Sequence, residues 1–281
     1  MNSSWRKGGI ATGALAGVAG AALVYATCIE PHWYDIKKVT VPLPILPKAF
    51  HSFTIVHISD LHIGYQVKAR HVKKIVAAIS AQKPDLIVFT GDFINSARSI
   101  KAARKCIPYF QELSAPYGKF AVWGNHDYLA PDDERISLLQ EAQFTCLVNE
   151  HTHIDRGEDT LYLAGLDDYL EGTADIEKAL DGIPDESCTI LLAHEPDYFK
   201  VSMKYNISLQ LSGHSHGGQV CVPFYGPLVT SKLGKAFHSG LYQHPSEPKF
   251  LYTNRGLGTT HLPVRFACRP EITVLTLVQG S

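Results

Sequence analysis

The chain has 281 residues, of which 45% are hydrophobic and 10% aromatic, enough to bury the core of one large domain. Its formal net charge of −1 provides no general excess of positive charge to neutralise phosphates, so a nucleic-acid partner is not expected. Six cysteines without a C-x-x-C spacing argue against a zinc ribbon and a redox pair, whereas 14 histidines are more than a packed core needs.

The N-terminal stretch, residues 1–34, is predicted to be a membrane segment. Residues 8–29 are uncharged and long enough to cross the hydrocarbon core of a bilayer. Arg6 and Lys7 precede this run and Glu30 follows it, so the positive-inside bias places the rest of the chain on the extracytoplasmic side. We therefore expect a single-pass anchor; a cleaved signal peptide and a lipoprotein signal are the alternatives.

A connector and a catalytic domain are expected to follow. Residues 35–50 contain three prolines and are predicted to be an extended connector. In residues 51–281 strand-like and helix-like segments alternate, which is typical of an α/β domain. The expected strands cover residues 53–58, 85–90, 118–123, 160–166, 189–193, 207–211, 250–253 and 271–277. The expected helices cover residues 67–81, 97–113 and 131–143.

Polar side chains that can bind metals follow the first two strands. Asp60 and His62 come directly after the first strand, and alternate residues share a face only while the chain is extended, so the pair could converge on one cation. The alternative is an N-cap carboxylate beside a core histidine. Asp92 follows the second strand after Gly91, which permits a sharp turn, and it should lie at the same sheet edge as Asp60.

Two later strands also end in polar clusters. The strand at 118–123 runs into Gly124-Asn125-His126-Asp127. Asn125 offers a neutral oxygen ligand, and His126 can donate or accept a proton near neutral pH. Asp127 could orient that imidazole. The strand at 189–193 is followed directly by His194.

The pair His214 and His216, hemmed by three glycines, is the most specific cluster, because core histidines are rarely paired in so tight a turn. Five strand ends therefore carry metal-ligating residue types. Open α/β sheets build their sites at the carboxyl ends of strands, so we expect these residues to converge. Asp167 and Asp168, in contrast, are expected to cap a turn.

The order Asp-x-His, Gly-Asp, Gly-Asn-His-Asp, His, Gly-His-x-His resembles the calcineurin-like metallophosphoesterase superfamily, and all five elements are present between residues 60 and 216. Residues 163–168, 192–197 and 254–272 are further similar to a bacterial membrane-associated branch. That branch includes phosphodiesterases and the UDP-diacylglucosamine pyrophosphatases of lipid A synthesis. The resemblance implies a four-layer αββα sandwich with two mixed sheets, preceded here by one transmembrane helix.

The resemblance also implies two divalent metal ions. It assigns one ion to Asp60, His62, Asp92 and His216, and the other to Asp92, Asn125, His194 and His214. Asp92 would then bridge the ions, and His126 would be the acid for the leaving group. Such ions lower the pKa of an attacking water and hold the phosphoryl oxygens. The mixed nitrogen and oxygen ligands favour Mn, Fe or Zn over Mg or Ca.

The implied activity is hydrolysis of phosphoric esters or anhydrides by a membrane-anchored enzyme, on a lipid-linked or nucleotide-sugar-lipid substrate. The alternatives are a small-molecule phosphodiesterase or phosphomonoesterase, and a non-catalytic scaffold of the same fold. The scaffold is opposed by the complete set of ligand histidines. Arg98, Arg255 and Arg265 could bind phosphate in bidentate fashion, with a surface role as the alternative for each.

Overall fold

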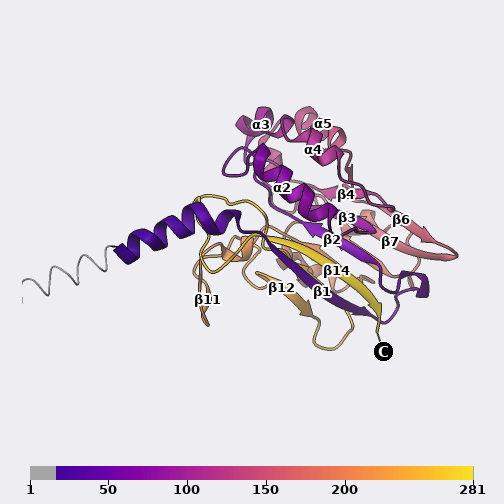
Figure 1. The fold of residues 1–281 in the computed structure, drawn as a ribbon. Helices are drawn as coiled ribbons and strands as arrows, with labels where there is room; N and C mark the ends of the chain where they lie inside the picture. Colours follow the sequence, from indigo (N-terminus) through magenta and orange to yellow (C-terminus); the bar gives the residue numbers. More distant parts are fainter. Residues whose placement is uncertain (1–16, 281) are drawn as a thin grey trace, which may run out of the picture.

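Two mixed sheets of six strands each form the body of the protein, which the computed structural model describes over residues 17–280 (Figure 1). The first sheet has the order β1 (Asp35–Leu43), β14 (Glu271–Gln279), β2 (Thr54–Ile58), β3 (Leu86–Thr90), β4 (Lys119–Val122) and β5 (Thr145–Cys146). The second has the order β12 (Gly240–Gln243), β13 (Phe250–Thr253), β9 (Leu209–Ser212), β8 (Thr189–Leu192), β7 (Asp159–Gly165) and β6 (Glu150–Arg156). A small hairpin joins β10 (Cys221–Val222) to β11 (Gly226–Pro227).

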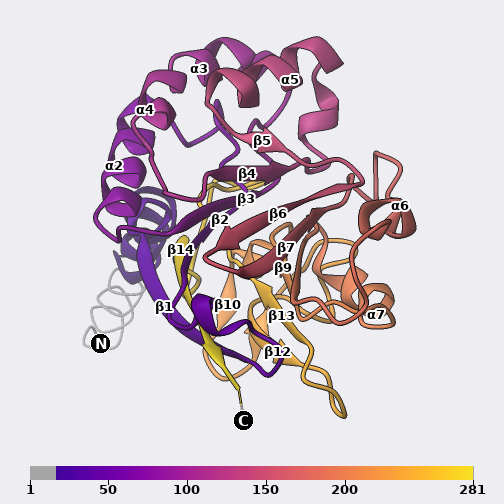
Figure 2. The same ribbon diagram turned by 90° about the vertical axis from the view of Figure 1, so that its right-hand side faces the viewer.

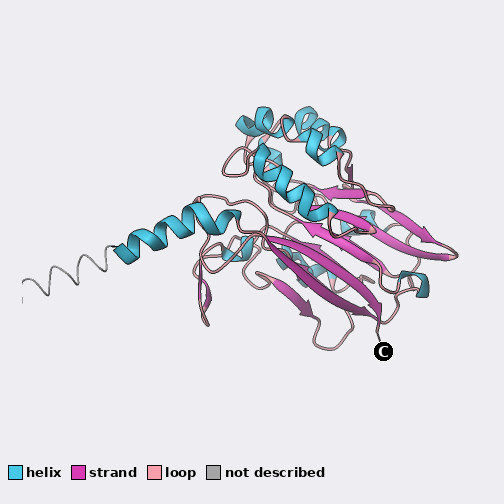
Figure 3. Ribbon diagram, viewed as in Figure 1, coloured by secondary structure: helices cyan, strands magenta, loops and turns pink. Residues whose placement is uncertain are grey.

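Helices cover the outer faces of both sheets (Figures 2 and 3). The first sheet carries α2 (Ala69–Ser80), α3 (Ile100–Arg104), α4 (Ile107–Gln111) and α5 (Asp132–Glu141), and the second carries α6 (Ile176–Leu180) and α7 (Phe199–Ser202). Within α2 the buried Val72, Ile75 and Ile79 recur at helical spacing, which gives the helix one apolar face. The α/β class predicted from the sequence and the two-sheet architecture implied by the family resemblance are therefore confirmed.

The continuous apolar run of β3 is explained by burial on both of its faces. All five residues of β3 are buried. Val88 packs with Ile55 of β2 against Leu163 and Ile190 of the second sheet, whereas the next residue, Phe89, packs under the helices. Each such side chain stabilises the fold by about 1.5–3 kcal/mol, so the sheets are held firmly against each other.

The segment predicted to be a free connector is part of the first sheet. Residues 35–43 are extended, but they form β1, which pairs in parallel with β14 from Asp35↔Glu271 to Leu43↔Gln279. β1 is an edge strand, so Pro42 can lack an N–H group without loss of a sheet hydrogen bond. The prolines therefore indicated extended backbone correctly but not its partner.

The single helix predicted over residues 97–113 is broken into shorter turns. The chain forms a 3₁₀ turn (Ala97–Ser99), then α3 and α4. Pro108 lies in the first turn of α4 and has no N–H group to continue the ladder from α3, and the Cys106 N–H bonds instead to the Ala103 carbonyl at 2.7 Å. Proline chemistry therefore overrides the apolar periodicity.

The N-terminal segment is helical over residues 17–24, continues into a π-helical turn (Tyr25–Ile29) and projects from the body (Figure 1). Across residues 17–280 no helix combines the length and the hydrophobicity needed to cross a membrane. Residues 8–16 of the predicted span lie outside the described residues. The end of the segment is tied to the body, because the buried Glu30 carboxylate accepts the backbone N–H groups of Ala267 and Cys268.

Candidate metal centre and active site

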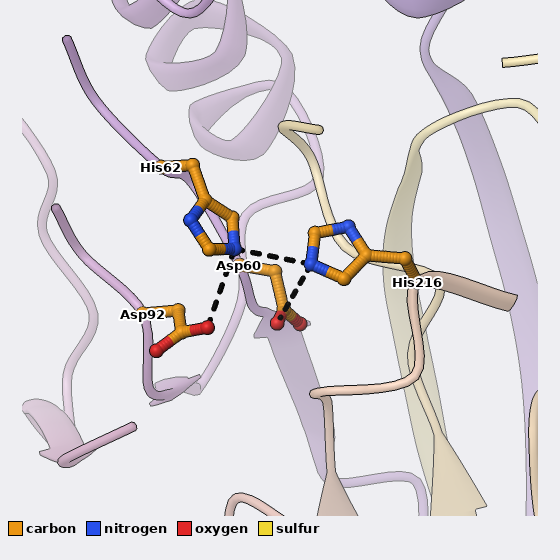
Figure 4. A group of neighbouring side chains, drawn as sticks. All are labelled: Asp60, His62, Asp92 and His216. Carbon is orange, nitrogen blue, oxygen red and sulfur yellow. Dashed lines mark hydrogen bonds and ion pairs between the residues drawn. The ribbon is translucent and has the colours of Figure 1, made fainter. Parts of the chain in front are cut away.

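The carboxyl ends of β2, β3, β4, β8 and β9 meet at one place and bring the predicted ligands together. Asp60, His62, Asp92 and His216 each offer a donor atom, and these four atoms lie within 4.8 Å of one another (Figure 4). Nε2 of His216 is 3.0 Å from Nε2 of His62 and 3.4 Å from Oδ1 of Asp60. All four residues are buried. The first predicted ligand group is therefore assembled in space.

The second predicted group adjoins the first through one oxygen atom. Oδ2 of Asp92 lies 3.2 Å from Nε2 of His62 and 3.4 Å from Nε2 of His194. Nδ1 of His214 lies 3.2 Å from the same His194 nitrogen and 3.1 Å from Oδ1 of Asn125. Asp92 therefore stands between the two groups, as a bridging ligand would.

The backbone at these positions is strained. Asp60, Asp92 and His214 have φ angles of 49°, 62° and 64°, and His62 and His216 also have positive φ. Residues with a Cβ adopt this left-handed region at a cost of roughly 1–2 kcal/mol each. Non-glycine residues in such conformations cluster at functional sites, where the surrounding structure enforces them. Packing of the two sheets thus holds the side chains in place before any ligand binds.

Two backbone carbonyls orient the imidazoles of the second group. Nδ1 of His194 donates to the Thr90 carbonyl at 2.6 Å, which leaves Nε2 facing Asp92. Nε2 of His214 donates to the Lys232 carbonyl at 2.6 Å, which leaves Nδ1 facing Asn125. Such bonds fix the tautomer of a metal-binding histidine. Gly91 makes room for this arrangement, since a Cβ there would lie 2.5 Å from Nδ1 of His194.

Burial and neighbouring charges strongly shift the pKa values at the site. Burial raises the pKa of Asp60; burial would lower the pKa of His194, but the Asp92 carboxylate outweighs it and holds the pKa well above its ordinary value. Burial would raise the pKa of Asp92, but the His194 and His62 imidazoles outweigh it and hold the pKa well below its ordinary value. Burial, followed by the neighbouring His62, holds the pKa of His216 well below its ordinary value, so this imidazole is neutral and keeps a lone pair. Burial likewise lowers the pKa of His214 to about 3.

The residues present fit a pair of divalent cations. Both carboxylates are buried, and their ion-pair partners in the described part of the chain are histidines. Imidazole nitrogens packed 3.0 Å apart, as in His62 and His216, gain from a cation between their lone pairs. Nitrogen and carboxylate donors together suit Mn, Fe or Zn.

His126 stands beside the ligands without belonging to either group. Its backbone N–H donates to Oδ1 of Asp92 at 2.8 Å, and its ring meets the His62 ring edge-on at 4.5 Å. Nδ1 donates to the Asn95 carbonyl at 2.9 Å, and Nε2 lies 3.4 Å from the hydroxyl of Thr260. His126 and Thr260 both line the cavity described below.

Asp127 does not orient His126, contrary to the sequence-based prediction. Its carboxylate accepts the backbone N–H groups of Asp92, Phe93, Ile94 and Gly124 at 2.9–3.2 Å. It thus shapes the turn that carries Asp92. The Asn95 carbonyl orients the imidazole instead, and a main-chain oxygen cannot be identified from residue types.

Two of the three arginines are held by structural partners, although the Arg265 guanidinium also lies 3.5 Å from Nδ1 of His216. The guanidinium of Arg265 is fully buried and donates to the carbonyls of Gly258 at 2.6 Å, Arg255 at 2.8 Å and Cys268 at 3.1 Å. Arg255 forms ion pairs with Glu271 at 2.5 Å and Asp35 at 2.9 Å. Arg98 is exposed on the 3₁₀ turn before α3. Arg255 and Arg265 are thus occupied by structural partners.

Asp167 and Asp168 cap a turn, as predicted. The Asp168 carboxylate accepts the backbone N–H groups of Leu170 and Glu171 at 3.1 and 2.7 Å. Asp167 accepts the N–H group of Thr173 at 2.9 Å. Asp167 also accepts the hydroxyl of Tyr128, so it ties the turn to the segment after β4.

A cavity of about 660 Å³ opens beside the ligands and has both polar and apolar lining residues. Its lining includes the candidate site residues Asp92, Asn125, His126, His214 and His216. It also includes the apolar side chains Val220, Leu228, Val229, Leu262 and Val264. Its size is that of a typical small-molecule site, with apolar walls and a few convergent polar groups.

Comparison with known proteins agrees with this geometry. The family model of calcineurin-like phosphoesterases matches residues 53–218. The metallophosphoesterase YkuE of Bacillus subtilis is 39% identical over 96% of this chain and 94% of its own, and the UDP-2,3-diacylglucosamine pyrophosphatase LpxG of Chlamydia trachomatis is 28% identical over 90% and 92%. A dimetal phosphatase from Danio rerio has the same fold, with a TM-score of 0.51, 12% identity and coverage of 76% of this chain and 91% of its own. The chain therefore belongs to the calcineurin-like phosphoesterase family and is a metal-dependent phosphoester hydrolase.

Proposed function

We propose that the protein hydrolyses a phosphoric anhydride or diester in a lipid-linked substrate. The observation that carries this proposal is the mixed lining of the cavity, in which a buried carboxylate and imidazoles occur together with apolar side chains. A water-soluble phosphate ester would use only the polar part of this lining. The resemblance to LpxG, whose name specifies a diacylated substrate, supports a lipid as well.

In this proposal seven residues hold two metal ions, with Asp92 shared. The first ion is held by Asp60, His62, Asp92 and His216, and the second by Asp92, Asn125, His194 and His214. When bound, such ions supply a low-pKa water as nucleophile and neutralise the phosphoryl oxygens during in-line attack. The chain positions the donors through the strained strand ends and the Thr90 and Lys232 carbonyls.

His126 protonates the departing oxygen in this proposal. Its Nε2 lines the cavity, while Nδ1–H is held by the Asn95 carbonyl, so the imidazolium form presents one N–H group to the substrate. General acid catalysis of this kind accounts for roughly 10²–10⁴ in rate. The benefit is greatest for leaving groups that are poor without a proton.

We also propose that residues 8–34 associate the enzyme with a membrane, with the catalytic body on the extracytoplasmic side. The uncharged run 8–29 and the preceding Arg6 and Lys7 support this topology. Leu23 and Val24 also expose apolar side chains at the end of the described helix. Protease protection in spheroplasts tests the side: digestion of the catalytic body from outside is expected, and protection contradicts it.

A substrate panel tests the proposed chemistry. Purified full-length protein, stripped of metal and reloaded with Mn²⁺, Fe²⁺ or Zn²⁺, is assayed on a phosphomonoester, bis-p-nitrophenyl phosphate, a nucleotide diphosphate sugar and its diacylated counterpart. We expect kcat/KM to be highest for the diacylated substrate. Equal values with and without acyl chains would favour a small-molecule phosphodiesterase, and Asp92→Asn protein provides the inactive control.

A further inference from the structure

The β10–β11 hairpin (residues 220–229) presents apolar side chains to solvent. Phe224 at its tip is fully exposed and Tyr225 is 80% exposed. The segment reads Val-Cys-Val-Pro-Phe-Tyr-Gly-Pro-Leu-Val and carries no charge. Burying a phenylalanine side chain contributes about 1.5–3 kcal/mol of free energy, and Phe224 does not gain this while it is in water. The exposed tip is therefore better explained by contact with an apolar partner.

This hairpin is joined to the N-terminal helix by one loop. The Cys221 N–H donates to the Phe266 carbonyl at 2.9 Å, and the Phe266 ring meets the Tyr25 ring edge-on at 6.2 Å. The helix exposes Val18 and Leu23, and it projects on the same side of the body as the hairpin (Figure 1). The exposed apolar side chains of both elements therefore lie on adjoining segments.

The hairpin is also a wall of the cavity. Leu228 and Val229, which directly follow β11, line the cavity and are themselves more than half exposed. His214 and His216 line the same cavity. Apolar side chains at the base of the hairpin and the ligand cluster therefore border one cavity.

Basic side chains follow the hairpin in the sequence, and the carboxylate of Asp197 accepts the backbone N–H groups of Ala236 and Phe237 beside them. Residues 198–246 contain no aspartate or glutamate, and the exposed Lys232 and Lys235 follow the hairpin directly. At the end of the helical segment the half-exposed Trp33 carries the Arg269 guanidinium 4.7 Å above its ring. Aromatic side chains beside basic ones are typical of the boundary between lipid head groups and acyl chains, and lysines are attracted to anionic lipids.

From these observations we infer that the β10–β11 hairpin inserts Phe224 and Tyr225 into an anionic lipid bilayer and sets the cavity mouth at the membrane surface. The acyl part of a substrate then passes along Leu228 and Val229 while its phosphates stay at the ligands. The docking of the hairpin does not depend on the proposed function. The substrate route, in contrast, rests on the proposed function.

Lipid-depth quenching tests the docking in the full-length protein. Vesicles of phosphatidylcholine and phosphatidylglycerol with brominated acyl chains are used, and Phe224→Trp is compared with Ile136→Trp on the distant α5. We expect Phe224→Trp to add quenched fluorescence beyond that of the native tryptophans, and Ile136→Trp to add only unquenched signal. Equal quenching of both added tryptophans would overturn the inference. The inference would also be overturned, in favour of self-association, if Phe224→Trp showed no lipid quenching and F224S/Y225S changed a dimeric protein into a monomer.

Turnover tests the substrate route. F224S/Y225S and the control Ile136→Ser are assayed on soluble bis-p-nitrophenyl phosphate and on a diacylated pyrophosphate embedded in the same vesicles. We expect equal activity on the soluble ester and a loss of about tenfold on the embedded substrate for the hairpin variant alone. Equal losses on both substrates would contradict the route. If no diacylated substrate is hydrolysed by the wild type while quenching persists, the proposed function fails and the docking stands.

Discussion

At the scale of single residues, Asp92 has the most consequential position. Its Oδ2 contacts imidazoles of both ligand groups, and its Oδ1 accepts the N–H group of His126. Four backbone hydrogen bonds to Asp127 shape the turn around it. One carboxylate thus links both metal groups to the candidate acid.

Asp92→Asn is expected to lose metal together with activity. The amide removes the negative charge that two cations would share, so elemental analysis should show less than one ion per chain and kcat should fall by at least about 10². Asp85→Asn is the matched control, because Asp85 caps the opposite end of β3 by accepting the N–H group of Thr54 at 2.7 Å. Two retained ions in Asp92→Asn would remove Asp92 from the bridging position.

His126→Ala is expected to keep both metals and to lose activity selectively. Because the acid assists the leaving group, kcat should fall by about 10²–10⁴ for an alkyl phosphodiester and much less for an aryl ester with a good leaving group. Steady-state kinetics on a series of leaving groups measures the difference. Equal losses along the series would exclude the acid role.

His57 makes the fold sensitive to acid. Burial lowers its pKa from the ordinary 6.5 to about 3, and Nε2 bonds to the Thr90 hydroxyl at 2.8 Å. As the pH falls below 6.5 the unfolded chain takes up a proton that the folded form excludes. The free energy of unfolding should therefore fall by about 1.4 kcal/mol per pH unit from this group.

Urea unfolding of metal-free protein between about pH 7 and 5 isolates this contribution when wild type and His57→Gln are compared. The glutamine can bond to Thr90 but does not titrate. The stability advantage of the wild type should shrink as the pH falls. A constant difference between the two proteins would show that His57 is not excluded from protonation in the folded state.

At the scale of elements, the loop 255–268 depends on Arg265. The buried guanidinium collects carbonyls along this loop and lies 3.5 Å from Nδ1 of His216. The loop also faces the N-terminal segment, since the Arg265 N–H donates to the Ala26 carbonyl at 2.9 Å. The arginine therefore supports a ligand-bearing turn from behind.

Arg265→Met is expected to lower the free energy of unfolding by about 3 kcal/mol or more, because several buried carbonyls lose their donor. Thermal unfolding with and without metal measures the loss, and the exposed Arg98→Met provides the control. If Arg265 served only to bind phosphate, its replacement by methionine would instead raise KM and leave the melting temperature unchanged.

At the scale of the whole molecule, residues 35–50 belong to the catalytic body. β1 pairs with β14 along nine residue pairs, and Asp35 anchors Arg255. Removing β1 would expose the whole edge of β14 and would take the buried Val41 and Leu43 out of the core between the two sheets.

Two truncations test this boundary. A chain of residues 25–281 retains β1 and the contacts of Glu30, so it should fold and remain active on a soluble ester. A chain of residues 51–281 should aggregate or melt more than about 10 °C lower, because an unpaired edge strand is a template for association. Equal melting temperatures would restore the connector interpretation.

The sequence by itself determined the strands that carry the site and the chemistry at their ends. Buried parallel strands are encoded locally as short apolar runs, and Asp60, His62, Asp92, Asn125, His194, His214 and His216 follow such runs directly. Tertiary structure decided what has no local signal. Carbonyl acceptors such as Thr90 and Asn95 have no residue signature, and β6 contains the polar sequence Glu-His-Thr-His-Ile-Asp-Arg, of which only Ile154 is buried. β1 pairs with a strand more than 200 residues away in the sequence, and the Arg265 guanidinium contacts residues up to 49 positions away. Such contacts form only when distant parts of the chain come together on folding.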